Sequence, residues 1–256
     1  MHATPARLAD EASIYPYTAL NVGSVRSLLV FAPHPDDEVF GCGGLIAVAL
    51  DAGARVQVVV VSDGGKGGDP AVRELESRRA ALALAGERSP AHLEFWCQPD
   101  REVSADQALV ERMRGCITHT QADWVLVPSP NEIHPDHRAV CVAGAEAVVQ
   151  AIGAGGTSKL VFYEVGQALH ATALIDITAV LERKRRAMDC FASQLSVQRY
   201  DEHVLALNRY RSFTLGAAVT HAEALQFPPV EELVNGLASV VRANARAIVQ
   251  RLGLAP

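Results

Sequence analysis

Short apolar runs alternate with segments of helical periodicity along most of this 256-residue chain, and this alternation limits the possible folds more than any other feature. The apolar runs of strand length are 27–32, 55–61, 92–97, 124–127 and 159–165. Helical segments are expected between them, at 39–52, 70–85, 106–120 and 138–152. The run RVQVVVV shows no polar alternation after Gln57, as expected of a strand covered on both faces. The pattern predicts an α/β protein with a doubly wound, Rossmann-like, mostly parallel sheet.

The alternation of strand-length and helical segments stops after residue 165. Residues 178–195, 205–225 and 230–252 favour helix, so we expect a helical C-terminal third packed on the α/β core. Neither a low-complexity linker nor an internal repeat divides the sequence. We therefore predict a single α/β domain over residues 1–256, with a core at about 26–215 and C-terminal helices over 216–256.

Composition excludes several classes of protein. With 49% apolar and 20% charged residues the chain is not disordered, and a net charge of −6 without a basic stripe argues against nucleic-acid binding. Five scattered cysteines, never spaced Cys-x-x-Cys, argue against a disulfide framework. Residues 1–17 lack a signal-peptide pattern, and no run is long enough to span a membrane. We expect a cytoplasmic protein without membrane insertion.

Two polar clusters follow two of the predicted strands. The segment 34–38, HPDDE, comes directly after the first strand, and the segment 134–137, HPDH, comes shortly after the fourth. In the common strand order 3-2-1-4-5 these two strands are neighbours, and the crevice at their carboxyl ends is where ligands bind. The sequence therefore predicts that two segments a hundred residues apart form one site.

The residue types in these clusters are typical of a catalytic metal centre. His34 and Asp37 are three residues apart, so one helical turn can direct both side chains to a single point, and His137 can add a third ligand. Two imidazoles and one carboxylate, with an exchangeable position left for water, favour a catalytic Zn²⁺ over a structural one.

The remaining polar residues suit catalytic roles around that ion. Asp36 is a candidate general base. His134, as imidazolium, could stabilise the oxyanion and then protonate a leaving amine. Asp136 could orient one of the imidazoles.

Other interpretations of the same residues remain open. A histidine at a strand end can be a hydrogen-bonded loop residue, and Asp-Asp-Glu before a helix can serve only as a cap. Two histidines and a carboxylate also form the iron(II) facial triad, which metal identity and oxygen dependence would reveal. A nucleotide-binding Rossmann protein is a further alternative, although the glycine loop at 62–69 lacks both common phosphate-binding patterns and is better explained by close backbone approach to a ligand or by a mobile rim.

The clusters and their spacing resemble the PIG-L (LmbE-like) family of zinc-dependent N-deacetylases. The similarity covers about residues 26–215. The matching features are HPDDE at 34–38 followed by Gly41, Gly43 and Gly44, HPDH at 134–137, Ser62-Asp63-Gly64 with Gly67, Arg73 with Glu76 and Ala80, Ala85-Gly86, Gln98-Pro99-Asp100, Asp176-Ile177-Thr178, and Lys184 with Ala187 and Ser193-Gln194.

The resemblance implies a function. Family members remove the acetyl group from N-acetylglucosamine units, so the implied partner is a small amino-sugar substrate, a mono- or disaccharide or a sugar conjugate. It implies Zn²⁺ on His34, Asp37 and His137, with Asp36 as base and His134 as oxyanion stabiliser and acid. Arg73 and Asp100 match sugar-contacting positions, although Arg73 could instead pair with Glu76 on its own helix. A homo-oligomer is compatible with the sequence.

Overall fold

The computed structural model describes residues 18–237 and 240. The first part alternates strand and helix: β1 (Ser27–Ala32), α2 (Asp37–Asp51), β2 (Arg55–Ser62), α3 (Pro70–Ala85), β3 (His92–Gln98), α4 (Gln107–Thr120), β4 (Trp124–Pro128), α5 (Pro135–Gly153) and β5 (Lys159–Tyr163). The second part holds β6 (Ala173–Asp176), α6 (Leu181–Met188), α7 (Ala192–Leu195), α8 (Tyr200–Arg211), β7 (Ala222–Gln226) and α9 (Val230–Val234).

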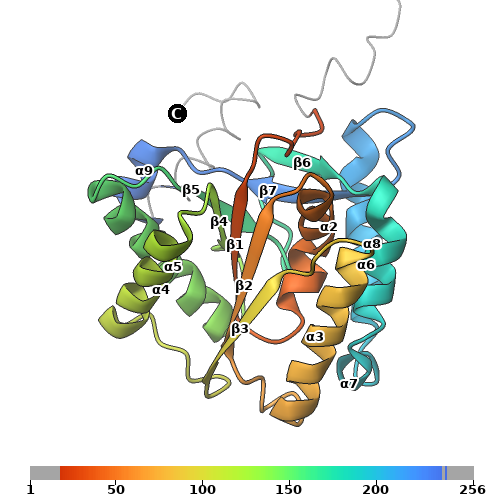
Figure 1. Ribbon diagram of the computed structural model, residues 1–256, viewed down its shortest axis with the longest axis horizontal. Helices are drawn as coiled ribbons and strands as arrows, with labels where there is room; N and C mark the ends of the chain where they lie inside the picture. The colour runs from red at the N-terminus through yellow and green to blue at the C-terminus, as the bar shows by residue number, and fades with distance from the viewer. Residues whose placement is uncertain (1–17, 238–239, 241–256) are drawn as a thin grey trace, which may run out of the picture.

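A single sheet, ordered β3-β2-β1-β4-β5-β7-β6 in the described residues, runs through the middle of the molecule (Figure 1). The five strands from β3 to β5 are parallel, and β7 is antiparallel to both of its neighbours. The predicted order 3-2-1-4-5 and the Rossmann-like, mostly parallel fold class are therefore confirmed. β1 and β4 lie side by side, so the crevice at their carboxyl ends is the topological switch point.

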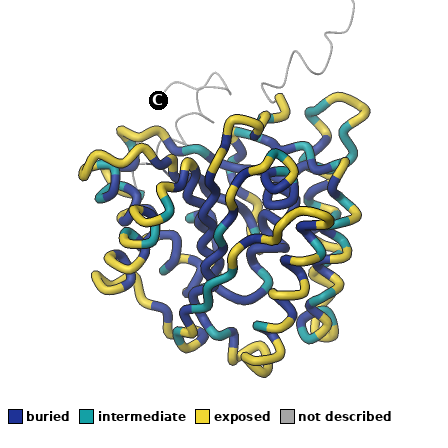
Figure 2. The backbone as a smooth tube through the Cα atoms, in the orientation of Figure 1, coloured by how far each residue is buried: buried dark blue, intermediate teal, exposed yellow. Residues whose placement is uncertain are grey.

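Helices cover both faces of the sheet, with α4 and α5 on one face and α2, α3 and α6 on the other (Figure 1). Successive residues of β1 alternate between the two apolar cores: Leu28 and Val30 pack beneath α2, whereas Leu29 and Phe31 pack beneath α5. Every residue of β1 is buried, and the strands form the buried centre of Figure 2. A strand buried on both faces has no reason to alternate polar and apolar residues, which explains the continuous apolar runs.

The C-terminal third differs in detail from the sequence-based expectation. The predicted helix over 205–225 is wrong, because α8 ends at Arg211 and Ala222–Gln226 forms strand β7. Strand β6 was not predicted, and the expected helix over 178–195 is divided into a 3-10 turn, α6 and α7. Of the predicted helix over 230–252, Val230–Val234 is helical in α9, and most of the rest lies outside the described residues, as does the segment 1–17.

Helix α2, which begins at the first polar cluster, is bent at Cys42, whose φ of −142° and ψ of 24° are not helical. The bend frees backbone groups that a straight helix would pair internally. The carboxylate of Glu223 on β7 accepts hydrogen bonds from the amides of Gly44 and Leu45, both at 2.7 Å. These bonds secure the second half of α2.

The ammonium of Lys184 on α6 also stabilises the bend, because it binds both the backbone of α2 and Glu223. Its Nζ donates to the Phe40 carbonyl at 3.1 Å, to Asn208 Oδ1 at 3.0 Å and to Glu223 Oε1 at 2.6 Å. Lys184 is fully buried and Glu223 nearly so, and each of their charged atoms has a partner. The Lys184–Glu223 pair therefore fixes the course of α2 and, with it, the place of the residues at its start.

None of the helices in the part of the chain that the structure describes is both long and apolar enough to cross a bilayer. The cytoplasmic location stays a prediction.

Candidate metal centre and its cavity

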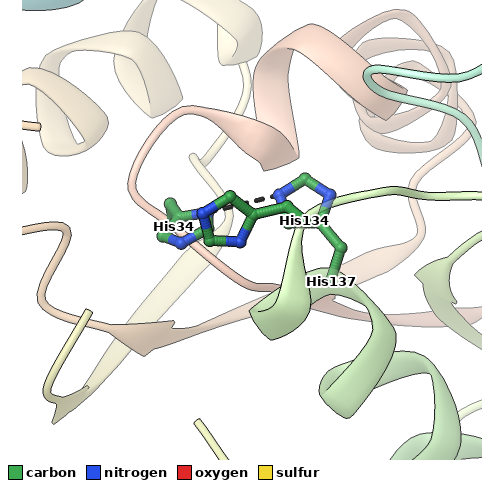
Figure 3. A group of neighbouring side chains, drawn as sticks. All are labelled: His34, His134 and His137. Atoms are coloured by element: carbon green, nitrogen blue, oxygen red, sulfur yellow. Dashed lines mark hydrogen bonds between the residues drawn. The ribbon is translucent and has the colours of Figure 1, made fainter. Parts of the chain in front are cut away.

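The two His-Pro-Asp segments meet at the carboxyl ends of β1 and β4, as their spacing predicted. His34 lies in the loop after β1, His134 caps α5, and His137 lies in the first turn of that helix. The three imidazoles converge (Figure 3), with ring centroids 4.5 Å apart for His34 and His134 and 5.2 Å apart for His34 and His137. Residues a hundred positions apart in sequence thus share one site.

The predicted ligands His34, Asp37 and His137 present three donor atoms in a tight triangle. His34 Nδ1 lies 3.2 Å from Asp37 Oδ2 and 3.2 Å from His137 Nε2, and His137 Nε2 lies 3.1 Å from Asp37 Oδ2. Four donors placed tetrahedrally at Zn–N and Zn–O distances of about 2.0–2.1 Å are separated by about 3.3 Å from one another. The donor set and its spacing therefore fit a divalent ion.

Other donors lie close enough to compete for the same ion. Ligand atoms of His34, His134 and His137 fall within 4.8 Å of one another, and a second such group combines His34 and His134 with Asp100 and Asp136. In the predicted triangle all three separations, 3.1–3.2 Å, are close to the spacing of tetrahedral ligands, which favours it as the primary set.

The electrostatics of the site favour a bound cation. Burial lowers the pKa of His34, but Asp100, Asp136 and Asp37 outweigh this effect and raise that pKa to about 12. Burial likewise opposes protonation of His137, while its contacts with Asp37 and Glu132 raise its pKa to about 9. Carboxylates in this pocket outnumber the fixed positive charges, and a divalent ion would supply the missing charge.

Asp36 sits beside the ligand triangle in an unusual backbone conformation. Its φ is 137°, a value that residues with a side chain seldom adopt, and such strain is found mainly where structure serves function. The amide of Asp36 donates to Glu38 Oε2 at 2.9 Å, and its carboxylate accepts from the Arg73 guanidinium at 2.8 Å. Burial and the neighbouring charge of Asp37 raise the pKa of Asp36 to about 8, while Arg73 acts in the opposite direction.

The hydrogen bonding of His134 defines its tautomer. The amide of Asp136 donates to His134 Nδ1 at 3.2 Å, so that nitrogen is unprotonated and the ring proton lies on Nε2. Burial and the adjacent imidazoles His34 and His137 also lower the pKa of His134. A neutral ring that presents an Nε2–H to the cavity can donate a hydrogen bond, whereas the sequence-based expectation was an imidazolium.

Asp136 and Asp100 lie against the outer nitrogen of His34. Asp136 Oδ2 is 3.1 Å and Asp100 Oδ1 is 3.4 Å from His34 Nε2. The contact with His34 lowers the pKa of Asp100 to about 2 against the effect of burial. Asp136 therefore contacts Nε2 of an imidazole whose Nδ1 faces the ligand triangle, and its orienting role stays a prediction.

Arg73, on α3, is buried and belongs to the site. Its guanidinium donates to the carbonyls of Gly64 and Pro35 and to Asp36, all at 2.8 Å. The alternative ion pair with Glu76 is wrong, because that carboxylate accepts from the amide and hydroxyl of Ser193. Arg73 is therefore placed to hold Asp36 as well as to line the cavity.

A cavity of about 380 Å³ opens over these residues, a volume within the usual range for small-molecule sites. It is lined by all of the residues named as ligands, base and acid, by Arg73 and Asp100, and also by Phe40, Lys66, Arg101, Glu132, Ile133, Gln194, Tyr200 and Val204.

Sequence reasoning missed Glu132 and the contribution of the C-terminal third. Glu132 Oε2 lies 3.4 Å from His137 Nδ1, and Oε1 accepts from the amide of Val165 at 2.9 Å. Gln194 on α7 donates to the Gly67 carbonyl at 3.0 Å, and Tyr200 and Val204 form part of the cavity wall. Ser193-Gln194 was among the segments that matched the family, but no spacing pattern linked Glu132, Tyr200 or Val204 to the two clusters.

Together, the fold and the site define a Rossmann-like α/β protein with a histidine–aspartate centre at its switch point. Residues 29–148 match the model of the PIG-L family, described as GlcNAc-PI de-N-acetylase. This match covers both polar clusters, HPDDE at 34–38 and HPDH at 134–137, and agrees with the resemblance that the motifs indicated.

Individual relatives include enzymes of two kinds. The chain is 27% identical over 202 residues to diacetylchitobiose deacetylase from Thermococcus kodakarensis, covering 66% of this chain and 70% of that one. It is 26% identical over 236 residues to 4-oxalmesaconate hydratase from Pseudomonas putida, covering 81% and 92%. The structure of N,N'-diacetylchitobiose deacetylase from Pyrococcus horikoshii superposes with a TM-score of 0.71 at 22% identity, over 82% of this chain and 86% of that one.

Proposed function

We propose that the protein hydrolyses the N-acetyl group of a small substrate containing N-acetylglucosamine, releasing acetate and a free amine. The observation that carries the proposal is the ligand triangle of His34, Asp37 and His137, flanked inside one cavity by Asp36 and the Nε2–H of His134. The PIG-L match and the deacetylase relatives support this reaction. We further propose that the whole chain acts as one domain.

The ion is proposed to be Zn²⁺, held by His34, Asp37 and His137. When bound there, it would polarise an amide carbonyl and acidify coordinated water. Glu132 and Asp136, which contact the outer nitrogens of His137 and His34, keep both imidazoles turned toward that position.

The two flanking residues divide the proton transfers and the charge stabilisation. Asp36, fixed by Arg73, accepts a proton from the attacking water, and the protonated carboxyl then donates it to the leaving nitrogen. His134, whose Nδ1 is occupied by the Asp136 amide, donates its Nε2–H to the developing oxyanion. The tautomer thus favours the oxyanion role of His134 over its role as the acid. Arg73 and Asp100 line the same cavity and remain candidates for sugar contact.

An acetate-release assay on a panel of N-acetylglucosamine compounds tests the proposal. Metal-loaded Asp36→Asn should retain its metal by elemental analysis and lose activity by about 100- to 10,000-fold in kcat, since the proton acceptor is gone. Asp106→Asn is the matched control, because Asp106 caps α4 away from the cavity and asparagine caps a helix equally well. Full activity in Asp36→Asn would show that the assigned base is wrong.

A second candidate is hydration of an unsaturated carboxylate. It is favoured by the match to 4-oxalmesaconate hydratase, which spans 92% of that enzyme. The same metal centre could activate water for addition to a double bond. Assaying 4-oxalmesaconate hydration beside acetate release, with the same metal-loaded preparation, distinguishes the two reactions.

A further inference from the structure

Two exposed cations, Lys66 and Arg101, line the mouth of the cavity. Lys66 lies in the loop after β2, and Arg101 lies in the loop after β3. In the described part of the chain neither side chain makes a hydrogen bond or ion pair. Arg73, the third cation of the cavity, is instead held by Asp36 and two carbonyls. Lys66 and Arg101 therefore differ from Arg73 in being free to bind a ligand.

The backbone of both cations is tied to the metal centre. The Lys66 amide donates to Asp100 Oδ2 at 2.9 Å, and the Arg101 amide donates to Asp136 Oδ2 at 2.7 Å. Both carboxylates also contact His34 Nε2. The two loops are thus anchored at adjacent points, and their exposed cationic residues line the cavity.

Arg101 occupies a conformation that normally favours glycine. Its φ is 68°, in the left-handed region, which is unfavourable for a residue with a side chain. The hydrogen bond to Asp136 holds this conformation. A glycine would relieve the strain but would leave this side of the cavity mouth without its guanidinium.

Another part of the cavity lining is apolar. Phe40 on α2 and Val204 and Tyr200 on α8 line it, and Ile133, 70% exposed, stands at its edge. A ligand in the cavity therefore meets cations on the side of the β2 and β3 loops and apolar surface on the side of α8. Such asymmetry orients a substrate that is charged at one end only.

We propose that Lys66 and Arg101 bind an anionic group of the substrate, a phosphate or a carboxylate, and thereby select charged amino sugars over neutral ones. This inference rests on the proposed deacetylation for the identity of the reacting amide. A guanidinium and an ammonium that line one cavity are groups that recognise such anions, through charge-assisted hydrogen bonds.

The test compares kcat/KM for acetate release from N-acetylglucosamine, N-acetylglucosamine 6-phosphate and N-acetylmuramic acid. The wild type should prefer at least one anionic sugar by about 10- to 100-fold, the effect expected of one or two charge-assisted bonds. The phosphate and carboxylate substrates tell the two sources of charge apart. In the double variant Lys66→Gln with Arg101→Gln the preference should fall to near one.

A matched double variant, Lys159→Gln with Arg55→Gln, removes one lysine and one arginine charge from exposed positions. These residues begin β5 and β2, so they lie at the amino ends of the strands, whereas the cavity lies at the carboxyl ends. It should keep the wild-type preference. Equal turnover of neutral and anionic sugars by the wild type, or an undiminished preference in Lys66→Gln with Arg101→Gln, would overturn the inference while leaving the deacetylase intact.

A binding measurement separates this inference from the proposed reaction. If the wild type releases no acetate from any of the sugars, the proposed function fails, and calorimetric titration with inorganic phosphate decides the anion site by itself. Binding weakened about 10-fold or more by Lys66→Gln with Arg101→Gln, relative to Lys159→Gln with Arg55→Gln, supports the site. Equal binding by both double variants overturns it.

Discussion

The metal centre and the Lys184–Glu223 pair are both clusters of buried charge. They differ in how fully their polar atoms are hydrogen bonded and their charges balanced. Lys184 Nζ has three acceptors, and both oxygens of Glu223 are hydrogen bonded. In the metal centre, by contrast, Asp136 Oδ1 is buried without a hydrogen-bond partner in the described structure, and carboxylates outnumber cations. The first cluster is satisfied by the fold alone, whereas the second keeps an unpaired buried oxygen and an excess of carboxylates, which the proposed cation would offset.

The role of a cluster of buried charges can be inferred from whether its polar atoms have partners within the protein. Burying an ion pair costs desolvation free energy, and the cost is offset only when the remaining donors and acceptors are satisfied. Where they are, the charges serve the fold, as at the bend of α2. Where charges are left unbalanced inside a cavity, they mark a candidate ligand site, as at the carboxyl ends of β1 and β4.

Removing a ligand of the metal centre should have the largest effect. In Asp37→Ala the triangle loses the oxygen that lies within 3.2 Å of both His34 and His137, so bound metal should be lost and kcat/KM should fall by at least about 1,000-fold. Elemental analysis and acetate release measure both quantities. Added EDTA should abolish wild-type activity and leave Asp37→Ala unchanged. Retained metal together with retained activity would exclude this residue as a ligand.

Breaking the satisfied pair should instead lower stability. Lys184→Met leaves the Glu223 carboxylate buried without its cation, so the free energy of unfolding should fall by about 3–5 kcal/mol in urea denaturation. Adding Glu223→Gln should restore part of that loss, because the uncompensated charge is gone, although only one of the amides of Gly44 and Leu45 keeps an oxygen acceptor and the other faces the glutamine NH2. If the double variant were less stable than Lys184→Met, the charge would not be the source of the loss.

The smallest effect should come from Glu132, which contacts the metal centre from outside. Glu132→Gln removes the negative charge 3.4 Å from His137 Nδ1, so metal affinity should fall by about 10- to 100-fold. A competition titration with a chromophoric chelator gives that affinity. Activity at saturating metal should decline much less than in Asp37→Ala. An unchanged affinity would assign Glu132 only to the loop that it binds at Val165.

The sequence predicted the first half of the fold well because its signals there are local. Buried parallel strands require continuous apolar runs, and glycines or capping residues end the helices between them. The common strand order of such folds was then enough to predict that the two His-Pro-Asp segments lie close together. The start of α5 at Pro135 instead of Arg138 is a smaller difference, explained by the His134 cap and a proline suited to the first helical turn.

The remaining features depend on tertiary contacts that no local pattern encodes. The sequence AEALQ of β7 consists of good helix formers, yet it lies between β5 and β6, where every residue is buried and strand pairing outweighs helix propensity. Arg73 pairs with Asp36 across the chain instead of with the nearby Glu76. Lys66 and Arg101 could be recognised as cavity cations only once their loops were placed.

Strand β7 also limits how this protein can be recombined with its relatives. The PIG-L match ends at residue 148, but Glu223 and Lys184, which secure the bend of α2, come from beyond it. A chimera could join the motif-bearing half of this chain to the downstream half of another enzyme. That downstream half would then need residues equivalent to Glu223 and Lys184 to bind the bend of α2. Without them, the helix that starts at Asp37 would lose the hydrogen bonds that fix its bend. The chimera would then carry the catalytic motifs of this chain without the contacts that hold them in place.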